Sequence, residues 1–147
     1  MADIGKLLAA TKLQLGILII LGLIRVGLSY LSITDINNKM GFTTQLPIFY
    51  ATLGLIAFLV VIWAGYKAAK VVKGSGIDGA VAGFAVSLIS SIIAGVLDII
   101  VLIQVSTKMQ GANVGLSYAI ALVLVGIIAA ALIGFILGAI GGFIGRD

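Results

Sequence analysis

The fold is decided by residues 79–95, GAVAGFAVSLISSIIAG, and residues 126–142, GIIAAALIGFILGAIGG. Each stretch carries a small residue at every fourth position. The first row of small residues consists of Gly79, Gly83, Ser87, Ser91 and Gly95, and the second row consists of Gly126, Ala130, Gly134, Gly138 and Gly142. Residues four apart share one face of a helix, so each row lets another helix backbone approach closely. The two rows therefore predict closely packed helices.

The composition excludes an ordinary soluble domain. Of the 147 residues, 62% are hydrophobic and 10% are charged, and the mean hydropathy is +1.32. Both rows lie within apolar runs long enough to cross a bilayer, and two further runs precede them. We predict an all-α integral membrane protein with one domain, a closely packed bundle over residues 1–147. Its transmembrane segments are expected at residues 13–33, 47–69, 79–103 and 116–140.

The segments between these runs give weaker signals. Residues 1–12 are mildly amphipathic and are expected at the membrane interface before the first span. Pro47 suits the first turn of the second span, and Asp78 is expected to cap the third. Gly141 and Gly145 extend the small face of the fourth segment, where they favour either a helix break or close docking.

Basic residues predict the orientation of the four segments. The terminal side carries Lys6, Lys12, Lys67, Lys70, Lys73 and Arg146, whereas the opposite side carries only Lys39 and Lys108. This asymmetry predicts that both termini are cytoplasmic in a multi-pass protein of the cell membrane. Lys67, Lys70 and Lys73 are expected to contact anionic lipid headgroups, either as topological anchors or as a lipid-specific regulatory site.

Arg25 and Asp98 are the ionisable residues that fall well inside the apolar segments. A charge near the centre of a transmembrane helix costs about 2.5–3.5 kcal/mol on insertion scales, so each is expected to have a partner. The pair is interpreted in three ways: a charge-gated ion pathway or proton relay, a salt bridge that fixes the first segment on the third, or contacts with a partner subunit.

The sequence offers no catalytic, metal or cofactor site. It contains no cysteine, histidine or glutamate, so the usual thiol and imidazole nucleophiles, bases and metal ligands are missing. Residues 74–79 match G-x-G-x-x-G, but a dinucleotide site needs a preceding strand, and here a transmembrane segment precedes the motif. Basic residues interleaved with aromatics, which would indicate nucleic-acid binding, are also absent. We expect no enzyme activity and neither nucleotide nor nucleic-acid binding.

The two rows, the ending GAIGGFIGRD and the short loops together resemble small uncharacterised prokaryotic, especially archaeal, four-helix membrane proteins with glycine-zipper helices. The resemblance covers mainly the third and fourth segments. It implies a prokaryotic cell membrane and carries no catalytic or binding residues.

Two functions agree with these features. The first is a structural or accessory membrane subunit whose small-residue faces pack against copies of itself or against a larger complex. The second is a small oligomeric channel or transporter in which Arg25 and Asp98 control an ion or proton pathway. The rows themselves suit packing within one chain, packing between subunits, or a pore formed by symmetric assembly.

Overall fold

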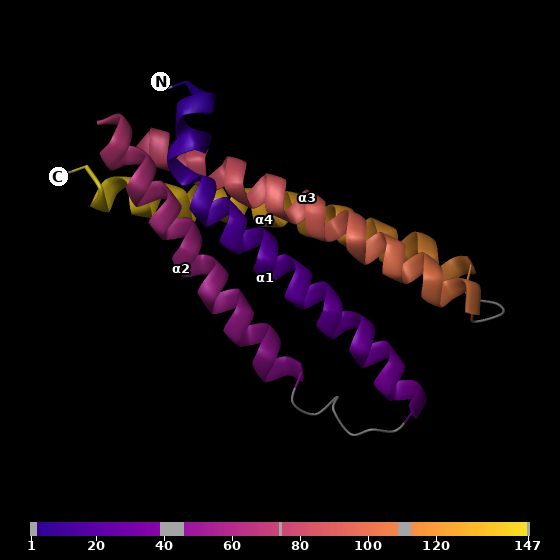
Figure 1. Ribbon diagram of the computed structural model, residues 1–147. Coiled ribbons are helices and arrows are strands. Elements are labelled where there is room, and N and C mark those ends of the chain that lie inside the picture. Colours follow the sequence, from indigo (N-terminus) through magenta and orange to yellow (C-terminus); the bar gives the residue numbers. More distant parts are fainter. Residues whose placement is uncertain (1–2, 39–45, 74, 109–112, 147) are drawn as a thin grey trace.

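Four long helices form the chain in a computed structural model, which describes residues 3–38, 46–73, 75–108 and 113–146 (Figure 1). They are α1 (Ile4–Asn38), α2 (Leu46–Val72), α3 (Gly76–Lys108) and α4 (Asn113–Ile144). Each helix contains a stretch of at least 26 residues that is long and apolar enough to cross a membrane. The chain is therefore an all-α protein of the multi-pass membrane type.

Every helix is longer than the span predicted for it. The largest difference is in α1, which begins at Ile4 and includes the segment that was expected to lie apart at the interface. Leu7 and Thr11 of that segment are fully buried, and Leu7 packs with Ala68 of α2 and Ala82 of α3. The apolar side of residues 4–12 is therefore part of the core of the bundle.

The start of α3 differs in detail from the prediction that Asp78 is the capping residue. Ser75 precedes the helix, and its carbonyl oxygen accepts hydrogen bonds from the backbone N–H groups of Asp78 and Gly79. The Asp78 carboxylate in turn accepts hydrogen bonds from the Ser75 N–H (2.8 Å) and hydroxyl (3.2 Å). Ser75 is thus the N-cap, and the Asp78 carboxylate accepts from its N–H, as the third residue of a capping box does.

The helices form two hairpins that lie together at one end of the bundle and separate at the other. Both ends of the described chain lie at the same end, which we call the terminal end (Figure 1). From there α1 and α2 diverge from α3 and α4 toward the opposite end, which we call the loop end, where α1 and α3 finish and α2 and α4 begin (Figure 1). Lys39, and the side chain of Lys108, belong to the part of the chain that is not described.

The backbones of α3 and α4 touch in the half of the bundle near the terminal end. A Cβ atom added to Gly83 would lie under 3.0 Å from the carbonyl oxygen of Gly134 and the Cα of Gly138. Added at Gly79, it would collide with Gly142 in the same way. Only small residues permit this separation, so these parts of the two rows pack against each other within one chain.

A second close contact joins α2 to α4. On α4 it uses Gly141 and Gly145, for which the sequence left a helix break or close docking open, and on α2 it uses Gly65, which was not singled out. A Cβ atom at Gly65 would collide with the backbone of Gly138, and one at Gly141 would collide with the backbone of Ile62. Gly145 lies equally close to the backbone of Tyr66. The glycine-rich end of α4 therefore continues as a helix to Ile144 and docks on α2.

The core between α1, α2 and α3 contains an amide group without a partner. Its apolar part includes Leu18 and Val86, with Val60, Val61 and Ala64 from α2. Gln14 lies one turn before Leu18, is fully buried, and neither atom of its side-chain amide has a hydrogen-bond partner among the described residues. A buried polar group without a partner destabilises the fold, because it has lost its hydrogen bonds to water.

We expect Gln14→Leu to stabilise the protein by about 1–2 kcal/mol, since it removes the unpartnered amide and keeps an apolar side chain of similar size. Thermal unfolding of both chains in the same detergent measures the change. Thr11→Val is the matched control, because the Thr11 hydroxyl is also buried but donates to the carbonyl oxygen of Leu7 at 2.8 Å. We expect Thr11→Val to lower the melting temperature, and the expectation for Gln14→Leu is wrong if that variant lowers it as well.

Candidate functional site

The structure brings Arg25 of α1 and Asp98 of α3 into direct contact. An N–H of the Arg25 guanidinium donates to Oδ2 of Asp98 at 2.5 Å. The Arg25 side chain is 49% exposed, whereas that of Asp98 is 18% exposed. Arg25 is therefore the accessible member of the pair. Its guanidinium borders open space between the helices rather than the packed core.

The register between α1 and α3 explains why these two residues meet. Both helices begin at the terminal end, so their chains run in the same sense although their axes diverge (Figure 1). Near the pair, a Cβ atom at Gly22 would lie 3.1 Å from the Cβ of Ala94, so the α1 backbone is close to α3 at this level. Arg25 follows Gly22 by one turn and Asp98 follows Ala94 by one turn, so their side chains lie on the sides of α1 and α3 that face each other.

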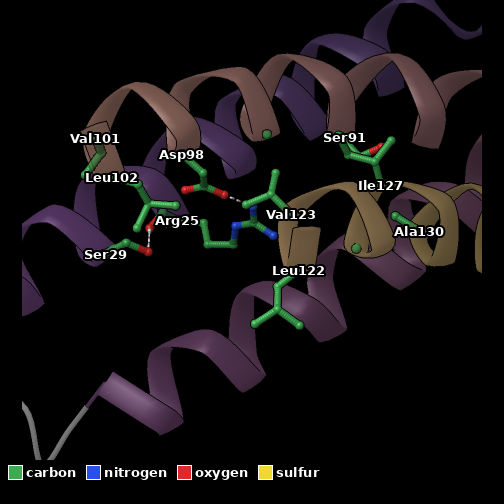
Figure 2. Close-up of a pocket in the computed structure, with 12 residues that line it drawn as sticks. Arg25, Ser29, Ser91, Asp98, Val101, Leu102, Leu122, Val123, Ile127 and Ala130 are labelled. Carbon is green, nitrogen blue, oxygen red and sulfur yellow. Dashed lines mark hydrogen bonds and ion pairs between the residues drawn. The ribbon is translucent and has the colours of Figure 1, made fainter. Parts of the chain in front are cut away.

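Two clefts meet at Arg25. The first has a volume of about 410 Å³ and lies between α1, α3 and α4, with Asp98 and Ser29 in its wall. Figure 2 shows Arg25 reaching toward Asp98 with Leu122 and Val123 of α4 nearby. The second has a volume of about 450 Å³ and lies between all four helices, reaching as deep as Leu18. We call them the ion-pair cleft and the central cleft.

The part of each row toward the loop end lines these clefts. Ser91, Gly126 and Ala130 belong to both clefts, and Gly95 belongs to the ion-pair cleft. A Cβ atom at Gly126 would have no neighbour within 4 Å. At Gly95 it would meet the side chains of Ile127 and Val123 rather than backbone. Each row thus packs backbone to backbone near the terminal end and borders open space toward the loop end.

The clefts also contain polar groups that the sequence did not assign to a site with Arg25 and Asp98. The hydroxyl groups of Ser29 and Tyr50 are 3.1 Å apart and join α1 to α2. Ser90 lines the central cleft and donates to the carbonyl oxygen of Ser87 at 3.2 Å. A row of hydroxyl residues on an apolar helix is the signal that could have indicated them, because such residues are seldom placed toward lipid.

The three lysines predicted to contact lipid headgroups follow one another along the end of α2. Lys70 donates to the hydroxyl of Tyr66 at 3.0 Å, and its Nζ lies 5.4 Å from the centre of the Tyr66 ring. Lys73 follows the helix with a φ of 50°, in the left-handed region that often ends a helix. Lys70 and Lys73 are exposed and Lys67 is partly buried, so their charges lie at the terminal end of the bundle.

The chemistry available at the site is limited to charge and hydrogen bonding. Within the described ranges there is no group of three or more side chains that would hold a metal ion. The clefts combine one guanidinium, one carboxylate and several hydroxyl groups with apolar walls. Groups of these kinds form ion pairs and hydrogen bonds.

Comparisons with known proteins add no assignment, because no family model, no curated protein and no solved structure matches the chain.

Proposed function

We propose that the chain is an accessory integral membrane subunit whose clefts receive a transmembrane helix of another subunit. In this proposal the protein lies in the cell membrane with both termini in the cytoplasm, and Lys67, Lys70 and Lys73 contact lipid headgroups. The assembly is formed either by copies of the chain or with a larger complex, and the protein performs no catalysis.

One observation carries the proposal: Gly126 is uncovered, although the other end of its row is covered by α3. Gly134, Gly138 and Gly142 already contact the backbone of α3, whereas Gly126 borders both clefts and has nothing within 4 Å of an added Cβ. Small residues in apolar helices favour close contact with another helix. An uncovered small surface beside a half-exposed arginine supports a contact completed by a further helix.

Native mass spectrometry of the chain, extracted gently from its own membrane, tests the proposal. The wild-type chain is expected in complexes heavier than 15.0 kDa, and Gly126→Leu is expected to release the single chain by filling the cleft. Ile128→Leu is the matched control, because Ile128 is 62% exposed on the same helix and outside both clefts. A wild-type chain found only at 15.0 kDa contradicts the proposal.

A second candidate function is the passage of ions or protons through an oligomer. The observation that favours it is the gathering of Arg25, Ser29, Ser91 and Asp98 around one cleft inside apolar helices. Ionisable and hydroxyl groups within a membrane are typical of ion and proton pathways.

Flux measurements separate the two candidates. Liposomes that contain the chain are expected to conduct ions or protons only under the second proposal, and Asp98→Asn is then expected to change the flux because it removes the charge beside Arg25. Ile128→Leu again serves as the control with an unchanged cleft. Silent liposomes with verified insertion would exclude the passage function and leave the accessory role standing.

A further inference from the structure

The chemistry of Arg25 restricts what occupies the clefts. A guanidinium group has five N–H donors. Asp98 accepts from one terminal nitrogen of Arg25, and no other described residue accepts a hydrogen bond from this guanidinium. With 49% of the side chain exposed, unused donors face the clefts. An occupant that supplies a hydrogen-bond acceptor at this level would satisfy them.

Charge balance restricts the occupant further. Asp98 already neutralises Arg25, so the pair has no net charge. A second carboxylate would bring an uncompensated negative charge into a region of low dielectric constant, which is costly. A neutral acceptor, such as an amide carbonyl or a hydroxyl group, would gain a charge-assisted hydrogen bond without that cost.

The walls restrict the size of the occupant's side chains. Gly54, Ala57, Ala94, Gly126 and Ala130 line the central cleft, whose volume is about 450 Å³. Small residues in a wall leave depressions that large side chains of a facing helix fill. A helix suits this space because the cleft extends along α1 from Leu18 to Arg25, nearly two helical turns.

We propose, on the basis of the proposed accessory role, that the occupant is a transmembrane helix with large apolar side chains and one neutral acceptor at the level of Arg25. The acceptor is the side chain of Asn, Gln, Ser or Thr. Its oxygen takes a hydrogen bond from an unused Arg25 N–H, and leucine-sized neighbours fill the depressions beside Gly126 and Gly54.

Designed peptides test the proposal with the full chain in lipid vesicles. The probes are three leucine-rich transmembrane peptides that differ at one position, which carries Leu, Asn or Asp. Energy transfer between the labelled chain and each labelled peptide measures the affinity. We expect the Asn peptide to bind roughly 5- to 30-fold more tightly than the Leu peptide, and we expect the Asp peptide to bind less tightly than the Asn peptide.

A change in the chain is expected to invert this preference. In Asp98→Asn, Arg25 loses its counter-ion, so the Asp peptide becomes the tightest of the three. In Gly126→Leu the cleft is filled, and all three peptides lose binding, whereas Ile128→Leu leaves the order unchanged. The acceptor position is moved along the peptide one residue at a time, and binding is expected to peak where it reaches Arg25.

The inference is overturned if the wild-type chain binds the Leu and Asn peptides equally. It is also overturned if the wild-type chain already prefers the Asp peptide, or if Asp98→Asn does not come to prefer it. Absence of binding by all three peptides also overturns it. None of these results affects the accessory role, because native complexes lost in Gly126→Leu would still show that a partner occupies the cleft. Conversely, if the chain is a single 15.0 kDa species in its own membrane but prefers the Asn peptide, only the accessory role is contradicted. Such a chain would retain the cleft's preference for a neutral acceptor.

Discussion

Gly138→Leu is expected to destabilise the protein by about 3 kcal/mol or more, because no arrangement of the leucine side chain avoids the neighbouring backbone. A Cβ atom at Gly138 would lie under 3.0 Å from the backbone of Gly79 and Gly83 on α3. The carbonyl oxygen of Gly138 itself lies against Gly65 of α2. The substitution therefore forces α4 away from α3, and this movement also disturbs the contact of the Gly138 carbonyl with α2.

Gly126→Leu is the matched control for this result. It makes the same chemical change three turns earlier in the same row, where an added Cβ has nothing within 4 Å. We expect its melting temperature in detergent to stay close to that of the wild type, whereas Gly138→Leu unfolds at a much lower temperature. Equal loss of stability in the two variants would show that leucine at these positions acts through something other than the backbone contact.

Asp98→Leu is expected to destabilise the protein by about 3 kcal/mol, because it leaves the Arg25 charge without its counter-ion in an apolar setting. The value lies at the lower end for breaking an ion pair in a protein interior, since the Arg25 side chain is half exposed. The double variant Arg25→Leu with Asp98→Leu removes both charges, and we expect it to recover most of the lost stability.

The three variants form a cycle that can be measured by unfolding in mixed micelles at several salt concentrations. A structural ion pair gives a double variant that is more stable than either single variant. If the two single effects simply add, the residues are not coupled in the folded protein, and the contact between them does not contribute to stability.

Much of the fold could be predicted from hydropathy, because apolar runs of this length have few alternatives to transmembrane helices. The ends of the helices could not be predicted from hydropathy, because a helix continues beyond its apolar stretch until it reaches a capping signal. α3 begins at Gly76, directly after its N-cap Ser75, because Ser75 and Asp78 are joined by hydrogen bonds. It does not wait for the polar residues to end. Likewise, residues 4–12 continue α1 because Leu7 and Thr11 are buried in the core.

The site was partly predictable as well. The cost of a charge in a membrane is enough to expect partners for Arg25 and Asp98, and the structure places them together. The division of each row into a packed and an open part depends on how the hairpins diverge, and a regular spacing of small residues carries no information on that. The contact of Gly65 with α4 was missed although Ala64, Gly65, Ala68 and Ala69 form a cluster of small residues in the sequence.

The closest backbone contacts made by the described glycines all involve α4, and this has a consequence for synthesis. The glycine contacts to α2 at Gly65 and to α3 at Gly79 and Gly83 both need the last segment of the chain. While a ribosome is still translating residues 113–144, the earlier helices can already form the Arg25–Asp98 bridge. Their glycine surfaces, however, still lack the α4 backbone that covers them in the folded chain. The glycine contacts of α2 and α3 can therefore form only after the last segment of the chain has been made, whereas the ion pair needs only α1 and α3.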